Sequence, residues 1–237
     1  MALSTLKKIR TDLRSCANPI KAATLQRFFK TGVGEYGAGD KFLGVTVPQQ
    51  RQIAKLHRDL PLTKLQTLLA SPLHEERLTA LLILVLRYKQ TDPTQQQKIY
   101  DFYFANVAGI NNWDLVDLSA PSIVGLHLLT RDKSILTKLI IAENLWLRRI
   151  AIVATWQFIR NNHWQTTLTL AKKSLSDPED LIHKANGWML REIGKRDFAV
   201  LDSFLRKHYQ AMPRTMLRYA IEKFPKKLRL AYLHNKI

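Results

Sequence analysis

The sequence predicts an all-α protein, a helical repeat array that occupies residues 1–237 as a single domain. Two observations carry this prediction. Apolar residues recur at the spacing of a helix along almost the whole chain, and proline and capping residues stand between these periodic segments. The alternation typical of a strand is weak and limited to residues 42–47.

Four segments show the helical pattern most clearly. The first apolar stripe consists of Leu3, Leu6, Ile9 and Leu13. Residues 78–86 are almost entirely apolar, which predicts a helix with neighbours on several sides. A stripe after Asn144 consists of Ile150, Ile152, Val153, Trp156 and Ile159. A fourth helix is predicted to open at Asp177-Pro178-Glu179-Asp180, with Asp177 as the cap and acidic residues facing the helix dipole.

Paired helices with short connections predict degenerate repeats of about 35–45 residues, the size of HEAT-like units. Stacked units of this kind form a solenoid with a concave groove. No strict sequence repeat is visible, so a compact irregular helical domain is the alternative.

The charge balance predicts a polyanionic partner. The chain has 37 Lys+Arg against 19 Asp+Glu, a formal net charge of +18. Residues 195–237 alone hold eleven Lys/Arg and three Asp/Glu. Because neutralising phosphates releases condensed counterions, such a protein is expected to bind nucleic acid, and the concave groove is expected to be basic. A basic protein without such a partner is the simpler alternative.

Several protein classes are disfavoured. Cys16 is the only cysteine, which excludes an internal disulfide and a thiolate metal cluster. The seven histidines show no spacing that converges on a metal, so each is expected to be a surface or satisfied polar residue, and neither a metal nor a cofactor is expected. The N-terminus lacks the apolar core of a signal peptide, and no apolar run approaches the roughly 20 residues of a membrane span. We expect a monomeric, cytoplasmic protein.

Residues 32–37, Gly-Val-Gly-Glu-Tyr-Gly, match the dinucleotide-binding fingerprint by letter alone. That fingerprint needs a preceding strand and a following helix, whereas residues 21–30 have a helical pattern here and residues 38–41 do not open a helix. The match is therefore rejected. Four glycines in eight residues predict a flexible surface loop, which could alternatively offer backbone N–H groups to a phosphate.

The most informative motif is Asn111-Asn112-Trp113-Asp114-Leu115-Val116-Asp117. On a helix, Trp113 and Asp117 share one face, one turn apart. Apolar residues at 115, 116 and 118 supply another side, so Trp113 and Asp117 are predicted to face a groove. A core tryptophan and a solvated aspartate are the alternative. A carboxylate among so many cations is suited to stabilise a positively charged transition state on a DNA backbone.

Two further blocks combine a tryptophan with arginines. They are Asn144-Leu145-Trp146-Leu147-Arg148-Arg149 and Lys184-Ala185-Asn186-Gly187-Trp188-Met189-Leu190-Arg191-Glu192. Flat rings stack on a sugar or a base, and arginines hold phosphates.

Together with residues 214–221, Arg-Thr-Met-Leu-Arg-Tyr-Ala-Ile, these blocks resemble the AlkD-type DNA alkylation repair glycosylases over most of the chain. Members of that family are HEAT-like proteins that remove cationic N3- and N7-alkylated purines from double-stranded DNA. The resemblance implies catalytic roles for Asp117, Trp113 and Trp188. It implies DNA contacts from Arg149, Arg148, Phe28, Lys184, Arg191, Arg214 and Arg218. Phe28 stands where the best-known members have a tyrosine, and residues 30–41 look like an insertion.

The chemistry implied by the resemblance is base excision. Asp117 would stabilise the cationic sugar and orient or deprotonate the attacking water. Trp113 and Trp188 would face the cationic nucleotide, at roughly 0.5–2 kcal/mol each, and Arg149 would grip flanking phosphates. Such a protein would be of bacterial type and associated with the nucleoid through DNA. The alternative is a non-catalytic HEAT-like module that binds bent, damaged or branched DNA.

Overall fold

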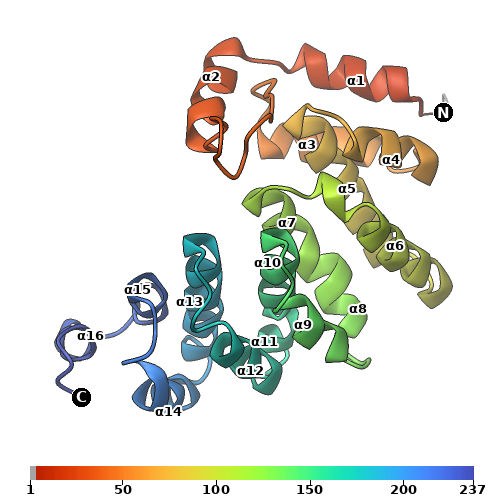
Figure 1. Ribbon diagram of the computed structural model, residues 1–237. Helices are drawn as coiled ribbons and strands as arrows, with labels where there is room; N and C mark the ends of the chain where they lie inside the picture. The colour runs from red at the N-terminus through yellow and green to blue at the C-terminus, as the bar shows by residue number, and fades with distance from the viewer. Residues whose placement is uncertain (1–3) are drawn as a thin grey trace. The chain divides into compact units, whose positions relative to one another are not determined.

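The computed structural model describes residues 4–237, and the fold over this range is all-helical (Figure 1). Within these residues no strand forms; a single parallel bridge joins Lys41 to Leu73, and residues 42–46 are irregular. The prediction of an all-α fold is therefore confirmed. The chain divides into two compact units, Met1–Ile123 and Val124–Ile237, each of which is described by itself. The single domain and the concave basic groove remain predictions.

The first unit is built around one long buried helix. Its elements are α1 (Leu6–Ser15), α2 (Pro19–Phe28), α3 (Val47–Leu56), α4 (Leu62–Leu69), α5 (His74–Gln90), α6 (Pro93–Ala105), the 3₁₀ turn η1 (Val107–Gly109) and α7 (Trp113–Ala120). Helix α5 packs against α1, α3, α4, α6 and α7, and its residues 78–85 are buried. The prediction of a helix with several neighbours is confirmed. Each of its fully buried leucines contributes about 1.5–3 kcal/mol of hydrophobic free energy.

Helix α1 follows the predicted apolar stripe. Ile9 and Leu13 are fully buried and Leu6 is half-buried, whereas Leu3 lies outside the described residues. The cap is Thr5, whose side chain accepts from the backbone N–H of Lys8.

Helix α2 is held by the segment that follows it rather than by a buried face. None of its residues is buried. The segment of residues 30–46 runs back beside α2, where the backbone N–H of Asn18 donates to the Leu43 carbonyl over 2.8 Å (Figure 1). Gly44 adopts a φ of +82°, and a Cβ there would lie 2.1 Å from the Asn18 carbonyl oxygen, so only glycine fits. This packing fixes the start of α2 against the segment that follows it.

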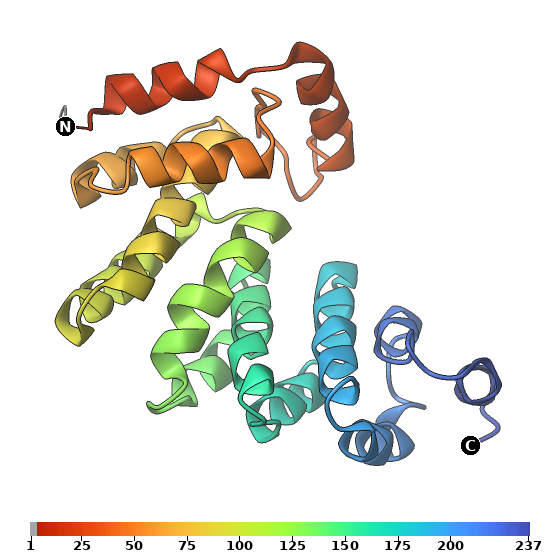
Figure 2. The same ribbon diagram turned by 180° about the vertical axis from the view of Figure 1, so that it is seen from behind.

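The second unit is organised around α13. After the π-helical turn η2 (Pro121–Gly125), its elements are α8 (Leu126–Leu128), α9 (Ser134–Leu139), α10 (Leu145–Ala154), α11 (Trp156–Arg160), α12 (Gln165–Lys173), α13 (Asp180–Gly194), α14 (Phe198–His208), α15 (Arg214–Ala220) and α16 (Lys226–Leu233). Helix α13 packs against α10, α11, α12, α14 and α15, and it stands between α10 and α15 in Figure 2.

Two predicted helices differ from the structure. The stripe after Asn144 is divided into α10 and α11 at Thr155, whose hydroxyl donates to the Ile152 carbonyl over 2.7 Å and competes with the regular helix bonds. The predicted helix start at Asp177 is wrong, because α13 begins at Asp180. The Asp177 carboxylate instead accepts from Arg148 Nε at 2.7 Å and from the backbone N–H of Glu179 at 2.9 Å.

None of the helices in residues 4–237 combines the length and the apolar character that crossing a membrane requires.

Candidate nucleic-acid interface

Helix α7 carries both Trp113 and Asp117, its first and fifth residues. Asn112 caps the helix: its Oδ1 accepts from the backbone N–H of Trp113 over 2.8 Å. Leu115 and Val116 are fully buried, whereas Trp113 and Asp117 are half-buried. The helix thus turns its apolar side inward and leaves the two predicted catalytic residues partly exposed. Trp113 is thus absent from the fully buried residues of this unit, and its role in the site stays a prediction.

An aromatic cluster surrounds Trp113. The indole stacks on Phe29, with ring centroids 5.2 Å apart and planes 23° apart, and Phe28 meets it edge-on at 6.0 Å. Phe29 also stacks on Phe42 at 5.2 Å. Phe28 is 62% exposed, so the cluster reaches the surface through that ring. The structure thus brings together Phe28 and Trp113, two of the residues named from sequence. Sequence reasoning missed Phe29 and Phe42, although the tandem Phe28-Phe29 was a visible signal.

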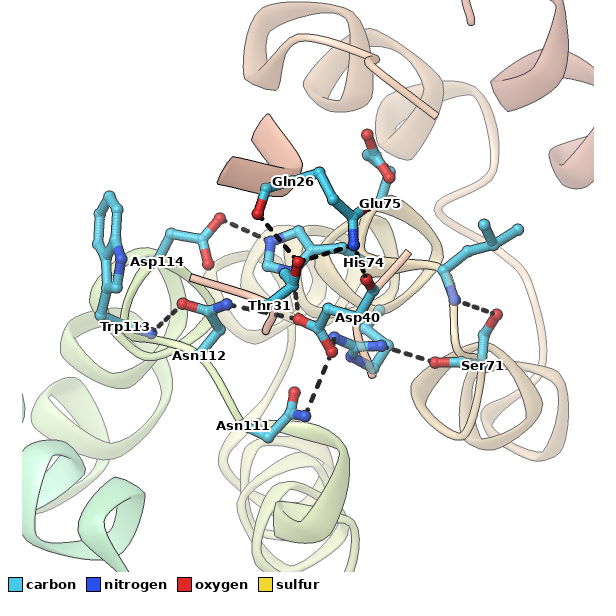
Figure 3. A network of polar contacts seen from close by, with 12 residues as sticks. Gln26, Thr31, Asp40, Ser71, His74, Glu75, Asn111, Asn112, Trp113 and Asp114 are labelled. Carbon is cyan, nitrogen blue, oxygen red and sulfur yellow. Dashed lines mark hydrogen bonds and ion pairs between the residues drawn. The ribbon is translucent and has the colours of Figure 1, made fainter. Parts of the chain in front are cut away.

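Beside this cluster lies a buried ionic network (Figure 3). His74, the first residue of α5, places Nδ1 3.1 Å from Asp40 Oδ2 and Nε2 2.8 Å from Asp114 Oδ2. Arg77 Nη2 lies 2.7 Å from Asp40 Oδ1, as a close ion pair rather than an aligned hydrogen bond. All four side chains are buried. His74 is satisfied, as expected of the histidines, but Asp40 and Arg77 carried no sequence signal that linked them to it.

The charges of this network follow from its contacts. Burial by itself lowers the pKa of His74, but the hydrogen bonds to Asp114 and Asp40 outweigh it and raise the pKa to about 8. Burial by itself raises the pKa of Asp40, but the hydrogen bond from His74 and the charge of Arg77 bring it below its usual value. At neutral pH, His74 is therefore an imidazolium that donates to two carboxylates.

Asp40 also links three elements of the first unit. Its backbone carbonyl accepts from Gln26 Nε2 of α2 over 2.8 Å. Asn111 and Asn112, directly before α7, reach its carboxylate through longer contacts of 3.4 Å. The neighbouring Glu75 carboxylate, 1% exposed, accepts from the backbone N–H groups of residues 43, 44 and 45. The loop after α2 is thus attached to the first turn of α5 and to the start of α7.

Several backbone N–H groups of the glycine-rich loop donate hydrogen bonds to acceptors within the loop itself. The backbone N–H of Gly32 donates to Glu35 Oε2 over 2.8 Å. Further N–H groups of the loop donate to carbonyls within residues 30–40, namely those of Glu35, Gly37, Ala38 and Asp40. These donors are therefore not available to a phosphate. Most of residues 32–39 are exposed, as a surface loop should be, but Gly37 and Asp40 are buried.

In the second unit, Trp188 is half-buried on α13. Gly187, just before it, allows α13 and α15 to approach closely. A Cβ at that position would lie 2.4 Å from Tyr219 Cβ and 2.6 Å from the Met216 carbonyl oxygen, so only glycine permits this packing. Trp188 and the basic helix α15 therefore belong to one tightly packed pair.

Arg148 and Arg149 both have structural contacts. Arg148 pairs with Asp177 at 2.7 Å and donates Nη1 to the Ala142 and Glu143 carbonyls. Arg149 is only 5% exposed and donates Nη1 to the Leu181 carbonyl over 2.6 Å. The two arginines tie α10 to the start of α13. Their contact with phosphates remains a prediction.

The other basic residues predicted to contact DNA differ in whether their charges are already paired within the protein. Lys184 pairs with Asp180 at 2.7 Å, and Arg191 pairs with Glu222. Arg214 is exposed and donates Nη1 to the Leu233 carbonyl over 2.8 Å. Arg218 is exposed, and among residues 4–237 it has no ion pair. Arg218 is therefore the most available of these cations.

The predicted site residues are distributed over both units. Phe28, Trp113 and Asp117 belong to the first unit, and the remaining seven belong to the second. Their convergence on one DNA duplex stays a prediction. Over the described range, no group of three or more His, Cys, Asp or Glu side chains is arranged to hold a metal ion.

Comparison with known proteins points to one family. Residues 9–224 match the family model of the DNA alkylation repair enzymes. A solved structure of a predicted DNA alkylation repair enzyme from Enterococcus faecalis superposes with a TM-score of 0.69 and covers 89% of this chain and 97% of its own. The two sequences are 19% identical, a level at which the likeness shows the fold alone. A comparison with curated proteins gives no match.

Proposed function

The chain belongs to the DNA alkylation repair enzyme family, and on this premise we propose that it is a DNA glycosylase. It hydrolyses the N-glycosidic bond of cationic N3- and N7-alkylated purines in double-stranded DNA. The observation that supports this most is on α7, where Trp113 and Asp117 are both half-buried, one turn apart, beside the exposed ring of Phe28. An aromatic surface next to a carboxylate suits a planar cationic substrate.

The reaction needs only one carboxylate. Alkylation at N3 or N7 gives the purine a positive charge and weakens its bond to C1′ of the sugar. When that bond breaks, its electron pair leaves with the base, which departs neutral and needs no proton. The positive charge passes to the sugar, where Asp117 stabilises it. A water molecule then adds its oxygen to C1′ and gives its proton to Asp117 or to solvent.

The aromatic residues bind the cationic nucleotide in this proposal. A cation over the face of a tryptophan is stabilised by about 0.5–2 kcal/mol. Trp113, supported by Phe29 on one face, is the first such residue, and Trp188 of α13 is the second. Neither contact requires the base to enter an enclosed pocket.

The basic side chains hold the phosphates. Residues 195–237 carry eleven Lys/Arg against three Asp/Glu, and Arg218 of α15 is exposed. Phosphate contacts position a duplex without reading its sequence. A repair enzyme that searches for damage throughout the genome needs such sequence-independent binding.

The decisive experiment measures base release from methylated duplex DNA under single-turnover conditions, with free 3-methyladenine and 7-methylguanine as the products. We expect release by the wild type and a loss of about 10²–10³ in rate for Asp117→Asn, with little change in DNA affinity. Asp59→Asn is the matched control, since it makes the same change at a side chain 82% exposed in the same unit. It should keep the wild-type rate.

Two outcomes would contradict the proposal. If the wild type binds methylated DNA and releases no base, the protein is a non-catalytic DNA-binding module. If it releases base and Asp117→Asn does so equally fast, the assigned mechanism is wrong.

A further inference from the structure

We propose that Asp40, His74 and Asp114 are positioning residues, which attach the glycine-rich loop to α7 and so hold Trp113 in place for base release. This role rests on the proposed function and assigns a purpose to the loop of residues 30–44. The three side chains are here called the clamp.

The clamp holds Trp113 through both of its sequence neighbours. Asn112, which is fully buried, caps α7 by accepting from the backbone N–H of Trp113 over 2.8 Å. Asp114, 7% exposed, is bonded to His74 Nε2 at 2.8 Å. The indole itself stands at the edge of the network, beside Asp114 (Figure 3). The backbone on either side of Trp113 is thus anchored, while its ring is left to contact Phe28 and Phe29.

The loop closes the clamp from the opposite side. Asp40 reaches His74 at 3.1 Å and Arg77 at 2.7 Å. The loop also passes close to the residues that support the indole. A Cβ on Gly37 would lie 2.5 Å from the Phe29 carbonyl oxygen and 3.5 Å from Asn112 Nδ2. A glycine is therefore required where the loop crosses the end of α2, and the loop, α2 and α7 pack as one body around Trp113.

The clamp depends on the proton of His74. The charged groups around this imidazole are Asp40 from the loop, Asp114 from α7, and Arg77 and Glu75 from its own helix. A neutral imidazole has one N–H, so it can donate to Asp40 or to Asp114 but not to both. Asp40 keeps Arg77 as a partner. Among residues 4–237, Asp114 has no cationic partner besides His74, and its Oδ1 has no hydrogen-bond partner. Loss of the proton therefore releases one end of the clamp.

A released clamp should impair catalysis more than binding. The three residues are between 2% and 7% exposed, so they offer DNA almost no contact surface of their own. A displacement of about 1 Å in a reacting arrangement can cost on the order of 10²-fold in rate. We expect His74→Gln to lower the single-turnover rate at least about tenfold while the Kd for DNA stays nearly constant, a separation that a general loss of folded protein would not produce.

The test with a readout independent of activity is the indole N–H resonance of Trp113 in a ¹H–¹⁵N spectrum, assigned by its absence in Trp113→Phe. Between pH 6 and 9.5 it should titrate in the wild type with a midpoint near the pKa of His74, about 8. In His74→Gln it should be shifted and no longer titrate. Asp114→Asn is the second variant, to be used if His74→Gln folds poorly. It preserves the shape of the side chain, removes its charge and should also shift the Trp113 resonance.

The matched control is His57→Gln. His57 is as buried as His74, at 2%, and belongs to the same unit, but its ring nitrogens contact Ser4 and Asp12 rather than α7. It should leave the Trp113 resonance and the base-release rate unchanged. A Trp113 resonance insensitive to both His74→Gln and Asp114→Asn would overturn the clamp. If the wild type shows the expected titration but releases no base, the clamp is supported and the proposed glycosylase activity is wrong.

Discussion

Trp113 is partly packed against other rings and partly exposed, so its truncation should affect stability and base release to different degrees. One face of the indole stacks on Phe29, and an edge contact joins it to Phe28, yet the residue is only half-buried. Its truncation should therefore cost less stability than that of a core aromatic, while the proposed substrate contact is lost completely.

We expect Trp113→Ala to lower the free energy of unfolding by about 2 kcal/mol, below the roughly 3–5 kcal/mol of a fully buried aromatic, and to abolish most base release. Urea unfolding and single-turnover kinetics on the same variant check this. Phe158→Ala, at a fully buried site, is the reference for full burial. An equal loss of stability in both variants, with normal activity per folded Trp113→Ala molecule, would make Trp113 a core residue.

The buried imidazolium of His74 makes stability depend on pH. The pKa of His74 is raised from 6.5 to about 8 in the folded protein. Its contribution is therefore complete below pH 6.5 and is lost as pH rises through 8. The size is about 2 kcal/mol, since one unit of pKa corresponds to about 1.4 kcal/mol. Urea midpoints measured from pH 6 to 9.5 should fall in the wild type, and His74→Gln should remove that part of the decrease. A wild-type stability that rises over this range would contradict the assignment.

The close approach of helices α13 and α15 depends on a glycine, Gly187, at their contact. Gly187 faces Tyr219 and Met216 at distances that no Cβ tolerates. Trp188 follows it directly, so the packing that seats α15 also determines where this tryptophan lies.

We expect Gly187→Ala to destabilise the protein by about 1–2 kcal/mol, because overpacking outweighs the gain of about 1 kcal/mol in helix propensity. Thermal unfolding measures it. Gly194→Ala is the matched control on the same helix, where the nearest atom is Cδ2 of Leu201, the far end of a flexible side chain. If Gly194→Ala destabilises the protein as much as Gly187→Ala does, the close packing of α13 and α15 is not the cause of the loss.

For the molecule as a whole, the net charge of +18 predicts salt-dependent DNA binding. Not every cation can contribute to it. Arg148 and Arg149 bind carbonyls and a carboxylate of their own chain, whereas Arg218 is exposed and unpaired among the described residues. The phosphate contacts that set the salt dependence are therefore best sought on α15.

Arg218→Ala should weaken binding to damaged and undamaged duplexes alike and reduce the slope of log K against log[salt] by about one unit. Titrations at several salt concentrations measure the slope. Arg206→Ala is the control, since Arg206 is exposed but its charge is paired with Asp202 at 2.7 Å. It should leave the slope unchanged. An unchanged slope in Arg218→Ala would place α15 outside the DNA interface.

The local features of this protein follow from short stretches of its sequence. The apolar run of residues 78–86 became the buried helix α5, and Asn144 caps α10 by accepting from the backbone of Trp146 and Leu147. Trp113 and Asp117 lie on one helix, as their spacing requires. Each of these depends on residues within one or two turns, where helical periodicity and capping chemistry decide the outcome. The blocks that carried the family resemblance are local in the same sense.

The contacts between groups far apart in the sequence depend on how the whole chain folds. His74 lies 34 residues from Asp40 and 40 from Asp114, and Arg148 lies 29 from Asp177. No periodicity relates such pairs, because the partner of a charged side chain depends on the path of the whole chain and on which groups burial leaves without water. For that reason the glycine-rich segment read as a plain surface loop, and Asp177 read as a helix cap. In the folded protein, Asp40 is buried and pairs with His74. Asp177 pairs with Arg148 instead of capping a helix.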